Sequence, residues 1–141
     1  MTSDLNRFLT AQQSGIYENA LSELKNGRKR GRWMWFIFPQ INGLGYSATA
    51  KYYAIKNNEE AEQYLNHPVL GERLLHCTHA VLTIENKTVL EIFGAPDNLK
   101  LNSCMTLFAQ LPNASPVFSR VIDKYFNGKP DTKTLALLGN G

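Results

Sequence analysis

The sequence predicts an all-α fold: a single compact orthogonal bundle of about seven to nine short helices over residues 1–141. Apolar residues recur at helical spacing through most of the chain, and glycines, prolines and capping residues divide it into short segments. Only residues 33–38 and 89–93 favour a strand, and a lone two-stranded ribbon is marginally stable. With 43% hydrophobic and 19% charged residues, a chain of 141 residues can bury one core without disulfides or metals.

The N-terminal segment predicts two helices. Ser3 or Asp4 would cap the first, whose apolar face lies within residues 5–9. The second covers residues 16–26 and ends at Gly27, since glycine readily adopts the left-handed conformation that closes a helix.

Residues 33–38 form an aromatic block whose intrinsic preference is for a strand. Because no sheet is available to receive it, we expect a short, wholly buried helix that ends at Pro39. Burial of so much aromatic surface stabilises the fold by several kcal/mol, so this block is expected to anchor the core.

Capping signals mark the helices in the middle of the chain. Ser47 would cap a helix that reaches residue 55, and Asn57 or Asn58 would open the next one. His67 and Pro68 end that helix, and Pro68 is expected at the first position of the helix that follows.

Four more helices are expected in the C-terminal half. Residues 88–93 form a short one that ends at Gly94, and Asp97 would cap a longer one. Residues 115–116 start another helix, and Asp131 would cap the last.

The first candidate site is a basic and aromatic rim. Five of the fifteen lysines and arginines lie within residues 25–32, although the net charge is only +3 and does not by itself imply nucleic-acid binding. Arginine side chains bind phosphate or carboxylate in two-pronged geometry, and an indole face stacks on a base. The candidate ligand-binding residues here are Arg28, Arg30, Arg32, Trp33 and Trp35. The alternative is a buried pair of tryptophans beside a solvated basic turn.

Two polar sets are further candidates. Gln40 and Ser47 flank a glycine-containing loop whose amides could hold an anion, although the loop lacks the length and lysine of a phosphate-binding loop. Asp97, Lys100 and Ser103 recur at helical spacing, so they could share one face, with Asp97 as the acid–base candidate. The alternative for both sets is ordinary capping and an internal ion pair.

Cysteine usage and the N-terminus predict a cytoplasmic protein. Cys77 and Cys104 lie in apolar-periodic stretches without a short paired spacing, which is typical of reduced, buried thiols. Residues 1–5 do not read as a signal peptide, and no apolar run is long enough to span a membrane. His76 and His79 fall short of a metal motif, so we expect no metal and no cofactor.

Several groups of residues, spread over nearly the whole chain, form a recognisable pattern. The groups are Asp4-Leu5, Arg7-Phe8, Ala11-Gln12, residues 27–30, 33–40, 43–45, Ser47, residues 53–55, 67–71, Arg73-Leu74, 92–94, Asp97, Lys100-Leu101, Ser103, residues 105–108 and 134–139. Together they resemble a family of small bacterial and plant proteins that is classed as a domain of unknown function and sometimes labelled calpastatin. The resemblance implies a helical single domain with no established activity. Cys104 stands where that family is expected to have serine, and His76 where it is expected to have a carboxylate.

Three functional hypotheses remain open. The favoured one is a pocket that binds or processes a nucleotide-like or ADP-ribose-like anion, and the segments at residues 7–12 and 33–38 are loosely similar to helical proteins that handle ADP-ribose derivatives. The second is a nucleic-acid or protein interaction module that uses the basic patch at residues 28–32. The third is a helical domain that acts only through a protein partner.

Overall fold

A computed structural model describes residues 4–139, and within that range it contains ten helices and no extended strand. The all-α prediction is confirmed, with one helix more than the upper estimate. An isolated parallel bridge joins Ile41 to Ile55. The helices are α1 (Asn6–Ala11), α2 (Ile16–Lys25), α3 (Met34–Ile37), α4 (Ala48–Tyr53), α5 (Asn58–Asn66), α6 (Leu70–Leu82), α7 (Val89–Phe93), α8 (Asp97–Ala109), α9 (Val117–Phe126) and α10 (Thr132–Leu137).

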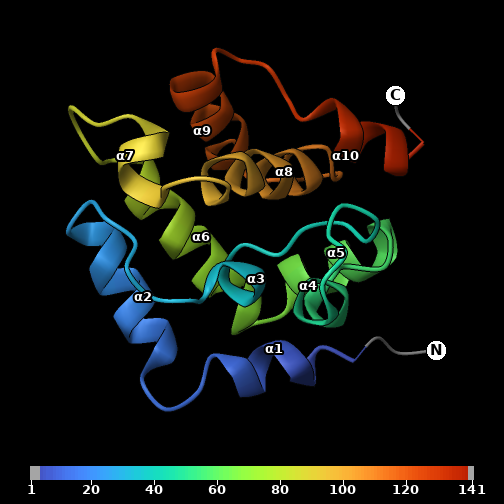
Figure 1. Cartoon of the computed structure of the whole chain (residues 1–141). Coiled ribbons are helices and arrows are strands. Elements are labelled where there is room, and N and C mark those ends of the chain that lie inside the picture. The colour runs from blue at the N-terminus through green and yellow to red at the C-terminus, as the bar shows by residue number, and fades with distance from the viewer. Residues whose placement is uncertain (1–3, 140–141) are drawn as a thin grey trace.

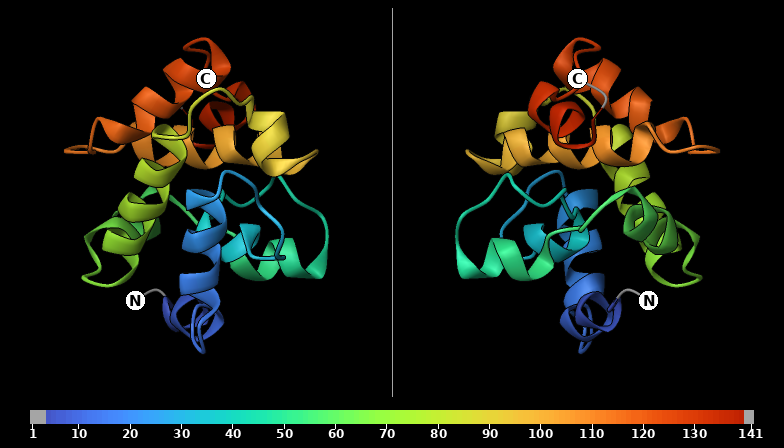
Figure 2. Two further views of the ribbon diagram at one scale, coloured as in Figure 1. Left: turned by 90° about the vertical axis from the view of Figure 1, so that its left-hand side faces the viewer. Right: turned by 90° about the vertical axis from the view of Figure 1, so that its right-hand side faces the viewer.

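The helices form two layers joined by α6 (Figures 1 and 2). The lower layer contains α1 to α5, and the upper layer contains α7 to α10. Helix α6 runs between the layers and packs against α2, α5 and α9, while α8 packs against α7, α9 and α10. The buried face of α6 includes Leu70, Leu74, Cys77 and Val81, as the apolar spacing of this segment predicts.

The aromatic block at residues 33–38 is a single helical turn, α3, as expected. Trp33, Met34 and Phe38 are buried, and their burial outweighs the strand preference of the sequence. The block is not wholly buried, however, because Trp35 stays partly exposed. One turn of helix points successive side chains in different directions, so Trp33 enters the core and Trp35 lines a pocket.

Several predicted caps are confirmed. The side chains of Ser47, Asn57 and Asp131 each accept a backbone N–H from the first turn of their helix. Thr88 does the same at α7, where Glu91 completes a capping box.

Three expectations about helix starts are wrong. Asp97 is the first residue of α8 rather than its cap, because its carboxylate pairs with two lysines instead. Helix α6 begins at Leu70 and not at Pro68, since His67 Nδ1 accepts the N–H groups of residues 69 and 70 from a preceding turn. Asp4 provides no side-chain cap for α1, and Ser3 lies outside the described residues.

A buried ion pair fixes α1 against α5, and the same arginine contacts the end of α4. Arg7 Nη2 lies 2.7 Å from Glu60 Oε1, and both side chains are almost fully buried. Arg7 also donates to the backbone carbonyls of Tyr52 and Ala54, both at 2.9 Å. Because a charge removed from water needs close partners, this arrangement holds the end of α4 in place.

Candidate functional site

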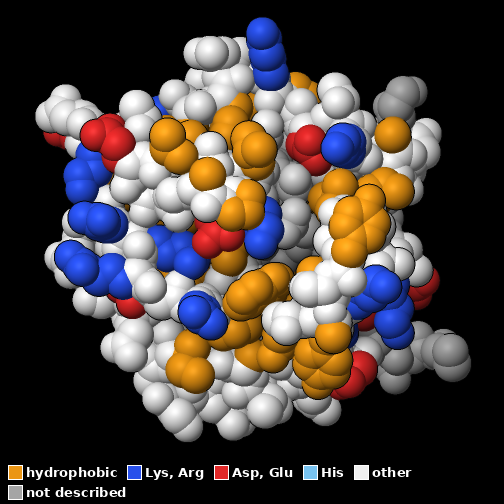
Figure 3. Space-filling model, viewed as in Figure 1, with side chains coloured by type: hydrophobic (Ala, Val, Ile, Leu, Met, Phe, Trp, Pro, Cys, Tyr) orange, Lys and Arg blue, Asp and Glu red, His pale blue; other side chains and the backbone are white. Residues whose placement is uncertain are grey.

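A pocket of about 630 Å³ opens between the two layers. One wall is formed by α8 and the start of α10, and the other by residues 40–47 and α4, with Trp35 of α3 at one end. Figure 3 shows a hollow in the middle of this face with apolar side chains along its rim. The volume lies within the range of small-molecule sites in proteins, about 300–1,000 Å³.

The loop wall is held in shape at both ends. The bridge between Ile41 and Ile55 closes the base of the segment: Ile55 N–H donates to the Gln40 carbonyl and Asn42 N–H to the Ile55 carbonyl, both at 2.8 Å. Gly45 packs so closely on α4 that a Cβ there would lie 2.5 Å from the Cβ of Ala50. Glycine is therefore required at this position.

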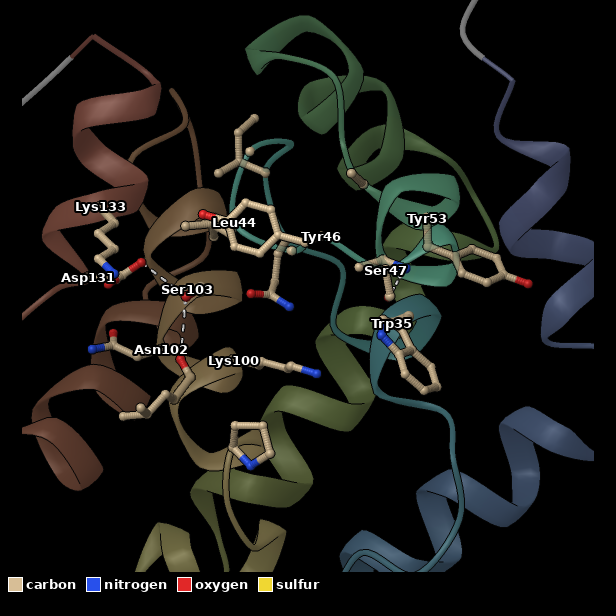
Figure 4. Close-up of a pocket in the computed structure, with 18 of the residues that line it drawn as sticks. Trp35, Leu44, Tyr46, Ser47, Tyr53, Lys100, Asn102, Ser103, Asp131 and Lys133 are labelled. Carbon is tan, nitrogen blue, oxygen red and sulfur yellow. Dashed lines mark hydrogen bonds between the residues drawn. The ribbon is translucent and has the colours of Figure 1, made fainter.

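Lys100 is the cation at the centre of the α8 wall. Its Nζ lies 5.4 Å from the centroid of the Trp35 ring, and Figure 4 shows the side chain reaching from α8 toward that ring. Asp97 stands behind it, with Oδ1 3.5 Å from Lys100 Nζ and Oδ2 2.9 Å from Lys29 Nζ. Because Asp97 is shared between two lysines, this corner of the pocket keeps a net positive charge.

Ser103 and Asp131 form the polar end of the pocket (Figure 4). The Ser103 hydroxyl donates to Asp131 Oδ2 at 3.0 Å, and the backbone N–H of Thr134 donates to the same oxygen at 3.2 Å. Asp131 thus caps α10 and fixes a buried hydroxyl on α8. Lys133 also lines this end, so the pocket is lined by two lysines and one aspartate among the described residues.

The exposed rim of the pocket is aromatic and aliphatic. Tyr46 projects from the loop with 87% of its surface exposed, and Leu99 on the opposite wall is 64% exposed. Exposed large apolar side chains beside a cavity are typical of surfaces that contact a ligand.

The basic loop at residues 26–33 lies beside the pocket rather than within it. Glu23 Oε1 organises this loop by accepting the backbone N–H groups of Arg30 and Gly31 and the indole N–H of Trp33, at 2.7–2.9 Å. Partial burial of Glu23 opposes its ionisation, but these hydrogen bonds outweigh that effect and lower its pKa.

Comparison with known proteins gives the chain its family. The model of a family described as a protein of unknown function, DUF1810, matches residues 2–138. This chain belongs to the DUF1810 family. The chain is also similar to a solved structure, the conserved hypothetical protein Rv1873 from Mycobacterium tuberculosis, which is 48% identical, with a TM-score of 0.94 and coverage of 96% of each chain. A search of curated proteins found no match.

The family match agrees with the resemblance to a domain of unknown function, and neither description mentions calpastatin. No helix in residues 4–139 is long and apolar enough to cross a membrane. Within the same residues, no group of three or more histidine, cysteine or acidic side chains could hold a metal ion. Cys77 and Cys104 are buried, unpaired thiols, and burial raises the pKa of Cys77 to about 12.

The structure brings five of the sequence candidates in this DUF1810 member together. They line the pocket and come from three separate segments: Trp35, Gln40, Ser47, Lys100 and Ser103. Asp97 stands behind Lys100 and does not line the cavity. The remaining candidates lie outside it: Trp33 is buried in the core, and Arg28, Arg30 and Arg32 are exposed on the basic loop.

Among the lining residues that were not candidates from the sequence are Tyr46, Asp131 and Lys133. Asp131 was interpreted as a helix cap, and it is one, so its second role left no separate signal. Tyr46 lies between Gly45 and the cap Ser47, and an aromatic residue inside a glycine-containing turn is a signal that could have indicated an exposed ring.

Proposed function

We propose that this DUF1810 protein binds a small anion of the nucleotide or ADP-ribose class in the pocket between α8, α10 and residues 40–47. The observation that carries the proposal is the Lys100 ammonium group held over the Trp35 ring inside a cavity of about 630 Å³. A cation in a partly enclosed site attracts a phosphate, because the surrounding apolar surface excludes water that would screen the charge.

The rest of the lining supports a ligand that has both an aromatic and a polyhydroxyl part. Trp35 and Tyr46 offer ring surfaces for a base, while Ser47 and Gln40 offer donors and acceptors on the loop wall. At the other end, the carboxylate of Asp131 can accept hydrogen bonds from ligand hydroxyl groups. A simple inorganic anion would leave most of these groups unused.

The proposal is one of binding, and Asp97 has a positioning role in it. Both of its oxygens contact lysine ammonium groups, so Asp97 holds Lys100 in place rather than facing the ligand. Processing of the ligand would require a group inside the pocket, where Asp131 is the described carboxylate.

The two tryptophans provide a direct test. In a Trp33→Phe variant the remaining indole is Trp35, at the pocket, and in a Trp35→Phe variant it is Trp33, in the core. We expect AMP, ADP-ribose or ribose 5-phosphate to change the fluorescence of the Trp33→Phe variant and to leave that of Trp35→Phe unchanged. Excitation at the red edge of the indole band avoids absorption by adenine.

Titration calorimetry with the unmodified protein then measures the affinity. Lys100→Met should weaken binding of the phosphorylated compound about tenfold or more, and uncharged adenosine should be insensitive to the change. Absence of heat and of any fluorescence response with all three anions would contradict the proposal. The two hypotheses left would then be an interaction module that uses the basic patch and a domain that acts only through a protein partner.

A further inference from the structure

The basic loop at residues 26–33 is not explained by a pocket for a free nucleotide. Arg28, Arg30 and Arg32 are exposed, and none forms an ion pair with another described residue. The Glu23 carboxylate accepts hydrogen bonds from two backbone N–H groups of the loop and from the Trp33 indole. It therefore fixes the conformation of the loop but forms no ion pair with the side chains of these three described arginines.

The basic loop and the pocket are joined by a chain of charges. Lys29 belongs to the loop, Lys100 to the pocket, and Asp97 bridges the two ammonium groups at 2.9 Å and 3.5 Å. Lys29 N–H also donates to the Ile92 carbonyl at 2.8 Å, which ties the loop to α7. The loop is thus fixed beside the pocket by contacts from both α7 and α8.

Figure 3 shows that both features lie on the same face of the molecule. Lysine and arginine side chains gather over the end of α2 and the loop that follows it, next to the central hollow. An anion that leaves the pocket past Lys100 therefore meets further positive charge on this side. On the far side of the hollow, the exposed ring of Tyr46 offers a stacking surface.

From this continuity we infer that the nucleotide in the pocket is the terminal unit of a single-stranded nucleic acid. Its neighbouring phosphates contact the exposed arginines of the basic loop, which Lys29 holds beside the pocket through its pair with Asp97. Binding proteins for single strands combine aromatic stacking surfaces with a positively charged track along the backbone, and this face presents both. The inference rests on the proposed function, because it places the terminal nucleotide in the same pocket.

The test compares AMP with the single-stranded ribo-oligonucleotide (pA)4, each titrated into the unmodified protein at several salt concentrations. We expect (pA)4 to bind about tenfold or more tightly than AMP in moderate salt, because extra phosphate contacts release counterions. The salt dependence should be steeper by about 0.7 in the logarithmic slope for each added phosphate contact.

Two double variants of equal charge separate the loop from the total charge. Arg28→Gln with Arg30→Gln should lower the affinity for (pA)4 and its salt slope, the latter by about 1.4, while AMP binding stays the same. Lys56→Gln with Arg120→Gln removes two exposed cations elsewhere and should change neither ligand. Lys100→Met should weaken both ligands.

Each other outcome overturns the inference in a different way. If (pA)4 binds no more tightly than AMP and has the same salt slope, the strand track is wrong and the pocket proposal stands. If (pA)4 binds without any effect of Lys100→Met, the loop is a surface module independent of the pocket. If polyglutamate displaces (pA)4 at equal charge, the loop attracts any polyanion. If neither ligand binds, both the inference and the proposed function fail.

Discussion

Trp33 and Trp35 stand two residues apart, and each lies beside a lysine, but they serve opposite sides of α3. Trp33 is 3% exposed and donates its indole N–H to Glu23 at 2.9 Å, and its ring centroid lies 5.2 Å from Lys29 Nζ. Trp35 is partly exposed at the pocket and lies 5.4 Å from Lys100 Nζ. The same pair of residue types therefore forms a core contact on one side and part of the pocket wall on the other.

The difference arises from what surrounds each pair. Trp33 is packed among aromatic rings of the core, with Phe38 and Phe93 at 6.1 Å and 6.5 Å between ring centroids. Trp35 faces a cavity, so its ring surface remains available. Asp97 joins the two pairs, because it contacts both lysines. Changes on the Trp33 side should therefore alter stability, and changes on the Trp35 side should alter binding.

The largest effect should come from Trp33→Ala, with Trp35→Ala as the matched change. Removing a fully buried tryptophan leaves a cavity and costs about 3–5 kcal/mol of unfolding free energy. Trp35→Ala should cost well under half of that, because its ring is already in part solvent-exposed. Equilibrium urea denaturation measures both. Equal losses would mean that Trp35 is core as well, and the comparison between the two sides would fail.

The lysines give the second contrast. Lys29→Met removes a nearly buried ion pair and a hydrogen bond to the Gly31 carbonyl, so it should cost about 2 kcal/mol of stability. Lys100→Met should cost less than about 0.5 kcal/mol, since its pair with Asp97 is longer and more exposed. The order should reverse for AMP affinity, measured by calorimetry on the same two proteins. Loss of AMP binding in a folded Lys29→Met variant would show that the two lysines act as one site.

The contrast between these neighbours also shows what sequence reasoning could reach. Helix capping is a local property, so the caps Ser47, Asn57 and Asp131 could be predicted from a few adjacent residues. The helical state of residues 33–38 was also reached, because the sequence offers no sheet for that block to join.

The different environments of Trp33 and Trp35 could not be predicted from the sequence. A single helical turn has too few residues for an apolar stripe to reveal which side faces a cavity, so Trp33 and Trp35 looked equivalent. The pair between Lys29 and Asp97 joins residues far apart in the chain, and nothing local predicts it. The pocket wall from Gly45 to Ser47 likewise depends on the bridge that closes it.

Glu23→Gln should have a smaller effect that depends on pH. The pKa of Glu23 is lower in the folded protein than its ordinary value of 4.5, so its ionised form contributes stability above that pH. This contribution is lost as the pH falls through the folded pKa. We expect the variant to be less stable than the unmodified protein by about 1–2 kcal/mol at neutral pH, because three N–H donors lose a charged acceptor. The difference should shrink below pH 4.5 in urea titrations, and a difference that grows on acidification would contradict the assigned hydrogen bonds.

The smallest of the four effects concerns the pocket side of the comparison. Asp131→Ala removes the cap of α10 and the partner of Ser103, and should cost about 1 kcal/mol. Asp131→Asn keeps an oxygen that can accept the Thr134 N–H, so it should cost only a few tenths of a kcal/mol of unfolding free energy. Differential scanning calorimetry of both variants measures the difference. Ser47→Ala, a cap on the opposite wall, provides a matched loss of the same kind. If Asp131→Asn were as destabilising as Asp131→Ala, the negative charge of Asp131 rather than its capping oxygen would hold α10 in place. The pocket side would then depend on a partly buried carboxylate charge, as the Trp33 side depends on Glu23.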